Sequence, residues 1–445
     1  MYLSILWHLH QPIYRDPESG RYVLPWVNYH LIKNYYQMAF LAEESGFPCT
    51  FNLVPCLIEQ IEEYCRGKAV DPVQGLLEAD PKRLSPADCG RLRRFLPAGT
   101  VASNPDETQI LALQSFFSPV MNTGKDRDTL LEEQKSAWKK VIPFYTRLWQ
   151  DGRIELTTSA YYHPLLPLVF DIRTGGETLM PASSFAHPED GKTQIRKGRE
   201  YFRRVFGQYP RGIWPSEGGI SREVAKTMAD EGYAFAVTDE NILWKTLKTG
   251  PDTCLLYRPY KCQALSILFR DRELSDLISF EYWRWPEKDA VSHLLAKLDE
   301  KGKSCPQDAI CVIALDGENP WAGYPENGVP FLRELYGRIL QRTDLTPIFL
   351  EKYLALSKPP SELEIVPGTW LGNFSKWIGS PAKNAAWDLL ARTREQCGPS
   401  EAMYVAEGSV WFWWFGEENV AEFDALFRGY LRRARQAQKR GGSNG

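Results

Sequence analysis

The stretch "AICVIALDGENPW", residues 309–321, joins an apolar segment to a turn and places Asp316 at the junction. A run of apolar residues that ends directly in Asp-Gly is typical of a buried strand followed by a loop. A second segment, "RGIWPSEGGIS" at residues 211–221, ends in the same way and places Glu217 before two glycines. A fold that gathers the ends of its strands would therefore bring two carboxylates together.

Similar segments recur along the chain, and amphipathic helical patterns separate most of them. The predicted strands cover residues 2–8, 49–54, 153–159, 212–214, 234–239, 265–269, 277–283 and 309–315. Strands that alternate with helices predict a parallel sheet. Seven or eight such units over about 320 residues favour a barrel, complete or incomplete, over an open sheet. No G-x-G-x-x-G follows a strand, so a dinucleotide-binding fold has no support.

Two regions depart from this alternation. Residues 56–150 are mostly helical in pattern and too long for a simple connection between strands, so we expect a helical insertion on the barrel. After residue 345 the pattern becomes helical again. We therefore expect a barrel domain at 1–345, including the insertion, and a C-terminal helical domain at 346–445.

Composition narrows the partners and the compartment. The net charge is -3 with no basic stripe, which argues against nucleic acid, and no run of eighteen apolar residues predicts a membrane span. The N-terminal "MYLSILWHLHQP" lacks a basic start and a small-residue cleavage site, so it resembles a first strand more than a signal peptide. Nine cysteines without a C-x-x-C pair indicate a reducing compartment. We expect a cytoplasmic protein.

The chain has fifteen tryptophans, an unusual number. Many of them adjoin glycine, proline or acidic residues: Trp7, Trp214, Trp283, Trp285, Trp321, Trp370 and Trp377. The flat face and the single N–H donor of tryptophan suit a pyranose ring. Any one of them could simply fill a large core, but the repeated placement at the ends of apolar runs favours a carbohydrate cleft.

Two carboxylates that face each other across a pocket can cleave a glycosidic bond. One protonates the leaving oxygen, and the other attacks the anomeric carbon or activates water. Glu217 and Asp316 both fall at predicted strand ends, where a barrel carries its active site. His8 and His10 alternate along the first strand and share one face. An acid after a strand is also an ordinary helix cap or loop charge, so neither carboxylate alone establishes catalysis.

A metal site is the second hypothesis. His8, His10 and nearby Asp16 could bind a divalent ion. However, only six histidines occur and none forms H-x-x-x-H or H-E-x-x-H. We predict neither a metal nor another cofactor.

Five motifs occur in an order that resembles glycoside hydrolase family 57. They are "WHLHQP", "GRIELTTSAYYHPLLPL", "GIWPSEGGIS", "ALDGENPW" and "AEGSVWFWW". The resemblance is closest to the α-amylase and amylopullulanase branch. It implies an incomplete (β/α)7 TIM-like barrel followed by a helical domain, and a retaining mechanism on α-linked glucans. Within it, Glu217 matches the nucleophile and Asp316 matches the general acid/base.

The resemblance also implies substrate-binding residues. His10 is expected to contact the sugar in the reactive subsite, with Trp214 and Trp321 around it. The other candidates from the resembling segments are His163, Arg270, Trp377 and Trp411, with Glu155 and Asp276 in less certain roles. One departure is Val410, which stands where related sequences usually carry an acid.

Three activities remain open at this stage. The first is a retaining hydrolase of α-1,4-linked glucans. A 4-α-glucanotransferase or branching-type transglycosylase would use the same two carboxylates, with a sugar hydroxyl in place of water. The third is a non-catalytic glucan-binding protein that keeps the aromatic cleft.

Overall fold

Seven parallel strands form a ring in the computed structural model, which describes residues 1–96, 101–117, 125–358, 360–418 and 420–441. They are β1 (Tyr2–Leu9), β2 (Cys49–Leu53), β3 (Glu155–Thr157), β4 (Gly212–Ile213), β5 (Phe235–Asp239), β7 (Leu265–Arg270) and β8 (Ile310–Asp316). Parallel ladders join β3, β2, β1 and β8 in that order, and others join β7, β5 and β4. A parallel bridge between Thr158 and Ile213 connects the two sheets.

The ring is incomplete between β7 and β8, where the described residues form no ladder. Single hydrogen bonds cross this gap instead. The Asp271 N–H donates to the Val312 carbonyl at 2.7 Å, and the Ala314 N–H donates to Ser275 Oγ at 3.1 Å. The Arg270 guanidinium donates to the Ala314 carbonyl at 3.0 Å. The predicted incomplete (β/α)7 barrel is thereby confirmed, and side chains satisfy backbone groups that a ladder would otherwise pair.

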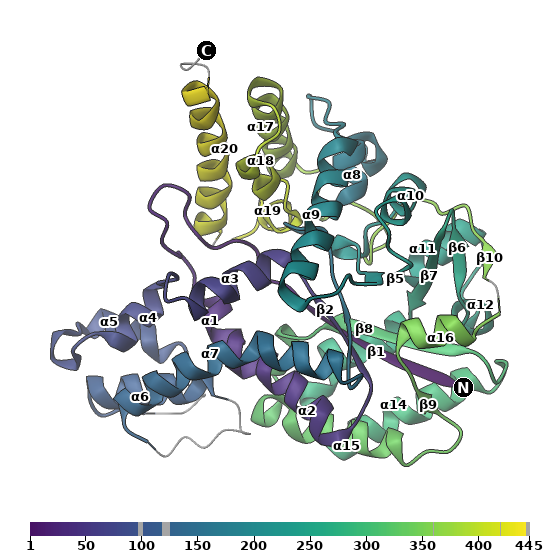
Figure 1. Cartoon of the computed structure of the whole chain (residues 1–445), viewed down its shortest axis with the longest axis horizontal. Coiled ribbons are helices and arrows are strands. Elements are labelled where there is room, and N and C mark those ends of the chain that lie inside the picture. Colours follow the sequence, from purple (N-terminus) through teal and green to yellow (C-terminus); the bar gives the residue numbers. More distant parts are fainter. Residues whose placement is uncertain (97–100, 118–124, 359, 419, 442–445) are drawn as a thin grey trace.

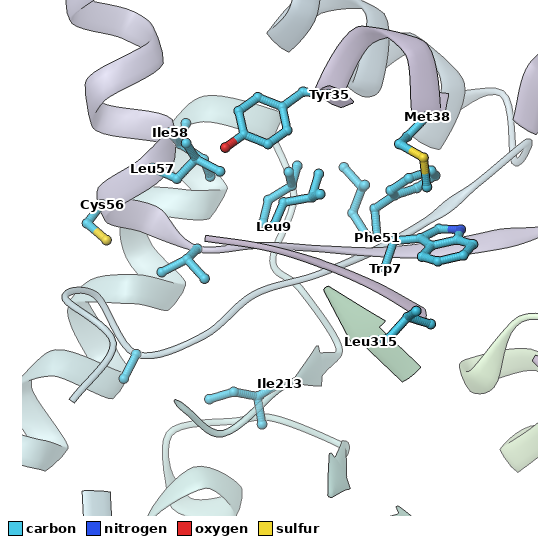
Figure 2. Close-up of a cluster of buried hydrophobic side chains, with 14 of the residues drawn as sticks. Trp7, Leu9, Tyr35, Met38, Phe51, Cys56, Leu57, Ile58, Ile213 and Leu315 are labelled. Carbon is cyan, nitrogen blue, oxygen red and sulfur yellow. The ribbon is translucent and has the colours of Figure 1, made fainter. Parts of the chain in front are cut away.

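The alternation of side chains along β1 divides the core into two layers. Leu6 points into the barrel, where it belongs to a cluster with Trp214, Val237, Leu268 and Val312. Trp7 and Leu9 point outward and pack against the surrounding helices. Figure 2 shows this outer layer, with side chains from β1 and β2 facing Tyr35 and Met38. His8 shares the inward face of Leu6 because the side-chain period of a strand is two residues.

Helices connect successive strands, as Figure 1 shows, and the short 3-10 or π segments carry the label η. The first connections contain α1 (Trp26–His30), η1 (Leu31–Tyr36) and α2 (Gln37–Ser45), then α3 (Pro55–Cys65), α4 (Pro72–Glu78), η2 (Pro81–Arg83), α5 (Pro86–Arg93), α6 (Pro105–Phe116) and α7 (Arg127–Gln150). The segment from α3 to α7 is the predicted insertion, and its described residues contain no strand. Residues 97–100 and 118–124 of that prediction lie outside the described part of the chain.

The remaining connections lie between β3 and β8. They contain α8 (Leu166–Phe170), η3 (Ile172–Gly175), α9 (Pro188–Phe206), η4 (Ser216–Gly218), α10 (Arg222–Asp230), α11 (Glu240–Leu247), α12 (Thr253–Leu256), β6 (Tyr260–Cys262), α13 (Arg272–Asp276), η5 (Leu277–Glu281), η6 (Tyr282–Arg284) and α14 (Glu287–Gly302). Strand β6 pairs with β7 in the antiparallel direction. The sequence analysis did not predict β6.

The chain after β8 first returns to the barrel and then forms a group of helices. It contains η7 (Asn319–Ala322), η8 (Pro325–Gly328), α15 (Val329–Leu340), β9 (Thr346–Pro347), α16 (Leu350–Leu356), β10 (Ser361–Glu362), α17 (Pro381–Cys397), α18 (Glu401–Ala406), α19 (Ser409–Trp414) and α20 (Ala421–Gly441). Helices α17, α18, α19 and α20 gather at one end of the molecule (Figure 1). The domain division at residue 345 stays a prediction, and residues 359, 419 and 442–445 of the predicted C-terminal domain lie outside the described part.

One predicted strand, 277–283, is wrong. The segment forms η5 and η6 instead. Leu274, Ile278 and Tyr282 are buried at intervals of four, whereas Phe280 is 63% exposed. This is the spacing of one helical face, so the aromatic and β-branched composition of the segment misled the prediction.

None of the helices in the described residues combines the length and the apolar character that crossing a membrane requires.

The incomplete edge of the barrel leads to a stability prediction. Ser275→Ala removes the acceptor of the buried Ala314 N–H, and we expect the free energy of unfolding to fall by about 2 kcal/mol. Urea unfolding followed by circular dichroism measures the change. The matched control is Ser279→Ala, because the Ser279 hydroxyl donates to the Ser275 carbonyl within its own helical turn. Equal midpoints for the two variants would contradict the role assigned to Ser275.

Candidate active site

Polar side chains lie at the carboxyl ends of the barrel strands. His8 of β1 stands in register with Asp316 of β8 on one side and with Asn52 of β2 on the other. Asp239 ends β5 and Arg270 ends β7. Because all these strands are parallel, their ends meet at one mouth of the barrel, where barrels of this kind carry active sites.

Glu217 sits in a strained turn directly after β4. Its φ of 58° and ψ of 25° fall in the left-handed region, which is unfavourable for a residue with a side chain. The Trp370 N–H donates to the Glu217 carbonyl at 3.0 Å and helps hold this conformation. Glycine suits the next two positions for different reasons. Gly218 is also left-handed, and a Cβ at Gly219 would lie 2.5 Å from the Leu165 side chain. The turn therefore directs Glu217 into the barrel mouth.

The Glu217 carboxyl is almost enclosed by protein. It is 8% exposed, and Ser409 Oγ donates to its Oε1 at 2.7 Å. Burial raises the pKa of Glu217 to about 7; the Ser409 hydrogen bond opposes this rise and the negative charge of Asp316 adds to it. His163 Nδ1 lies 3.8 Å from Oε1. This contact is not an ion pair near neutral pH, because burial lowers the pKa of His163 well below its usual range.

Asp316 is the more exposed of the two carboxylates. It ends β8, is half-buried, and accepts a hydrogen bond from Asn319 Nδ2 at 3.2 Å. Its charge contributes to the raised pKa of Glu217, whose main cause is burial. Burial also raises the pKa of Glu318; a hydrogen bond from Tyr35 opposes that rise and the charge of Asp316 adds to it. It also partly offsets the lowered pKa of His8, whose main cause is burial. Asp316 is thus electrostatically coupled to the buried groups around it.

Three histidines form one wall of the site. The ring centroids of His10 and His163 are 3.9 Å apart, and those of His8 and His163 are 5.1 Å apart. Burial lowers the pKa of each ring, so all three are neutral near pH 7. His8 Nδ1 pairs with Asn52 Oδ1 at 2.7 Å, which requires the proton on Nδ1. Nε2 of His10 and Nε2 of His163 are buried and have no hydrogen-bond partner among the described residues, which leaves two polar atoms available to a bound molecule.

The metal hypothesis named His8, His10 and Asp16. Asp16 instead lies in an exposed turn, where its carboxylate accepts hydrogen bonds from Ser19. His163 takes its place beside the other two histidines, with one possible ligand atom of each residue within 4.8 Å of the others. However, the rings of His10 and His163 stack with an interplanar angle of 28°. In-plane lone pairs of stacked rings run side by side, which does not favour their convergence on one ion.

The predicted substrate contacts separate into two groups. His10 lines the cleft described below. The ring centroid of Trp214 lies 5.7 Å from that of His8, but Trp214 is 1% exposed and packs in the inner barrel cluster, so its ring face is not free for a substrate either. Three others are at most 1% exposed and pack in the core: Trp321, Trp377 and Trp411. Such burial leaves no free ring face and argues against direct contact of these three with a substrate.

Arg270 has a bridging position at the incomplete edge of the barrel. Its Nε donates to Asp239 at 2.7 Å, and its guanidinium lies 5.6 Å from the ring of Trp370. Arg270 also contacts Asp276 at 3.5 Å. It therefore fixes the wall beside Glu217. Glu155 lies at the opposite end of the barrel, at the start of β3, where it accepts the Leu350 and Glu351 N–H groups of α16.

Three site residues were missed by the sequence analysis. Ser409 contacts Glu217 from 192 positions away, and Asn52 orients His8 from the next strand. Glu318 is 3% exposed and accepts hydrogen bonds from the His10 N–H and the Tyr35 hydroxyl. Only Glu318 carried a sequence signal, since it lies two residues after Asp316.

A cleft of about 840 Å³ adjoins this site; Glu217 and Asp316 are not on its lining. His10 and Asn319 lie on its lining, and the insertion and the C-terminal helices supply its walls. Six Phe, Tyr or Trp side chains line it: Tyr14, Trp26, Tyr29, Phe95, Trp414 and Phe423. Val410, which replaces the usual acid, is on the same lining, together with Arg91 and Arg94. Aromatic walls with polar groups at one position suit a sugar polymer.

Comparisons with known proteins agree with this geometry. The family model of glycosyl hydrolase family 57 matches residues 4–363. An α-amylase from Pyrococcus horikoshii is 22% identical over 61% of this chain and 39% of its own length. A 4-α-glucanotransferase from Thermococcus litoralis is 22% identical over 63% of this chain and 39% of its own length. The chain thus spans about two fifths of the length of these relatives.

Solved structures support the same fold. An α-amylase from Thermotoga maritima superposes with a TM-score of 0.69 at 15% identity, over 99% of this chain and 93% of that one. A branching enzyme from Thermococcus kodakaraensis gives a TM-score of 0.69 at 17% identity, over 98% and 88% of the two chains. With the family model covering most of its length, the chain belongs to glycosyl hydrolase family 57.

Proposed function

We propose that this chain cleaves α-1,4-linked glucans with retention of configuration, with Glu217 as nucleophile and Asp316 as general acid/base. One observation carries the proposal. An enclosed carboxyl and a more exposed, electrostatically coupled carboxylate lie at the ends of barrel strands beside an aromatic-lined cleft. Glycosidases of this type need two carboxyl groups in unlike environments.

The proposed reaction has two steps. In the first, Asp316 gives its proton to the glycosidic oxygen as the bond from that oxygen to the anomeric carbon breaks, and Glu217 bonds to the same carbon. In the second, Asp316 removes a proton from an incoming hydroxyl, which displaces Glu217. Because the neighbouring histidines are neutral, they do not lower the pKa of Glu217, and burial raises it to about 7. Glu217 is therefore mostly ionised, and able to attack the sugar carbon, only above about this pH.

The substrate class rests on the cleft and on the relatives. Trp26, Tyr29, Phe95 and Trp414 offer stacking surfaces along a space that extends well beyond one sugar. The similar proteins include α-amylases, a 4-α-glucanotransferase and a branching enzyme. Water as the acceptor gives hydrolysis, and a second glucan in the cleft gives transfer. We propose hydrolysis first and glucan transfer as the second activity, because the long cleft has room for an acceptor chain.

The activity test uses maltoheptaose, with products resolved by chain length. We expect the unmodified protein to form shorter chains, and Glu217→Gln to lose on the order of 10⁴-fold or more in rate. Longer chains beside shorter ones would identify transfer. The matched control is Glu155→Gln, which changes another buried glutamate far from the barrel mouth and should retain activity. An active Glu217→Gln variant would contradict the assignment, and binding of glucan without any turnover would support the non-catalytic alternative.

The pH dependence follows from the pKa of Glu217. A nucleophile must be ionised, so kcat/KM should fall as the pH decreases through about 7, the raised pKa of this buried group. Initial rates on maltoheptaose between pH 4 and 9 measure this fall, which is the acid limb of the pH profile. Burial also raises the pKa of Glu155 to about 7, yet Glu155→Gln should leave the limb in place because Glu155 lies away from the site. A limb near pH 4 would indicate a different ionising group.

A further inference from the structure

Ser409 reaches the candidate nucleophile from the C-terminal part of the chain. It is the first residue of α19, is fully buried, and its Oγ lies 2.7 Å from Glu217 Oε1. It also contacts His163, with Oγ 3.2 Å from Nδ1. The barrel alone therefore does not supply the full set of contacts around Glu217.

The hydrogen atoms in this group can be assigned by counting donors. Serine has one O–H, and an ionised Glu217 only accepts, so the Ser409 proton is directed to Oε1. Ser409 Oγ then accepts from His163, which requires that the neutral imidazole carry its proton on Nδ1. His163 Nε2 is consequently an unprotonated acceptor to which no group in the described part of the chain donates. The two hydrogen bonds therefore run in one direction: His163 donates to Ser409, and Ser409 donates to Glu217.

The position of Ser409 is fixed by its own loop and by the loop of His163. The Ser409 N–H donates to the His163 carbonyl at 2.9 Å, and Pro164 pairs with Gly408 in an antiparallel bridge. Gln194 of α9 joins the same two loops. Its Nε2 donates to Glu407 at 2.7 Å and its Oε1 accepts from the Tyr162 N–H at 3.1 Å.

Two residues of the site have strained backbones, and Ser409 contacts both of them. Glu217 and His163 are both left-handed residues with side chains, with φ of 58° and 55°. Both are held by Ser409, which hydrogen-bonds the side chain of each. Unfavourable backbone conformations persist only where surrounding contacts over-determine them.

We propose that Ser409 is a positioning residue for the Glu217 nucleophile: its hydroxyl holds Oε1, so that Oε2 is the oxygen that attacks the anomeric carbon. The described residues give Oε2 no hydrogen bond, which leaves its lone pairs available. In the first step the Oε2–carbon bond forms, the bond from that carbon to the leaving oxygen breaks, and Asp316 supplies the proton. The Ser409 proton stays on serine and bonds the carbonyl oxygen of the resulting ester. This inference rests on the proposed function of Glu217.

The test compares Ser409→Ala and Ser409→Cys in the full chain with maltoheptaose. Loss of one hydrogen bond to a charged group should lower kcat/KM at pH 7 by about ten- to a hundredfold for Ser409→Ala. Since that bond favours the ionised form of Glu217, its loss should also move the acid limb of kcat/KM upward by about one pH unit. Ser409→Cys keeps a weak donor and should give a smaller loss and a smaller displacement.

The matched control is Ser400→Ala. Ser400 caps α18 in the same C-terminal group of helices, and its hydroxyl accepts from the Met403 N–H. This variant should unfold at lower temperature but keep the acid limb of the unmodified protein. If Ser409→Ala does not fold, as judged by circular dichroism, the test rests on Ser409→Cys. An acid limb of kcat/KM that is displaced upward in Ser409→Cys supports the inference, and an unmoved acid limb contradicts it.

Two results would overturn the inference. One is a Ser409→Ala variant with kcat/KM within twofold of the unmodified protein; the other is a lowered rate with an unmoved acid limb, which indicates a structural role. Glu217→Gln measured in parallel separates the two claims. If it stays active, the proposed function itself fails. If it is inactive while Ser409→Ala behaves as the unmodified protein, only the role of Ser409 fails.

Discussion

The parallel register of β1 between β2 and β8 is the constraint on which the site depends. It sets His8 directly beside Asp316 on one side and Asn52 on the other. A shift of one residue would turn these side chains from the barrel interior to the surrounding helices. The alternation of β1, with Leu6 facing the barrel interior and Trp7 facing the surrounding helices, opposes that shift. A shift of one residue would move each of these side chains out of the layer in which it packs. The packing of the barrel thus fixes the positions of the catalytic candidates.

Burial gives the site its electrostatic character. The histidines are neutral because they are removed from water, and Glu217 has a raised pKa for the same reason. No charged partner compensates Glu217 among the described residues, and Ser409 supplies a neutral donor instead. Asp316 retains contact with solvent, so the two carboxyl groups differ in environment although the charge of Asp316 acts on Glu217. A low-polarity pocket strengthens each remaining interaction with a charged transition state.

Much of this arrangement was predictable from local sequence. Apolar runs ending in an acid identified β8 and the turn at Glu217, because strand ends and turns are short-range features. The strand predicted at 277–283 failed, since the composition concealed a helical spacing of buried residues. The tryptophans Trp321, Trp377 and Trp411 were assigned to the cleft, yet they fill the core. The contact of Ser409 was not predictable, because it depends on packing between distant segments and no local pattern encodes it.

The most direct test of the account is to trap the covalent intermediate. The protein is incubated with a 5-fluoro-α-glucosyl fluoride and digested, and its peptides are mapped by mass spectrometry. We expect one added fluoroglucosyl group, located on the peptide that contains Glu217. Attachment to any other carboxylate would contradict the assignment of the nucleophile. Turnover with inverted product configuration and without any adduct would contradict the retaining mechanism itself.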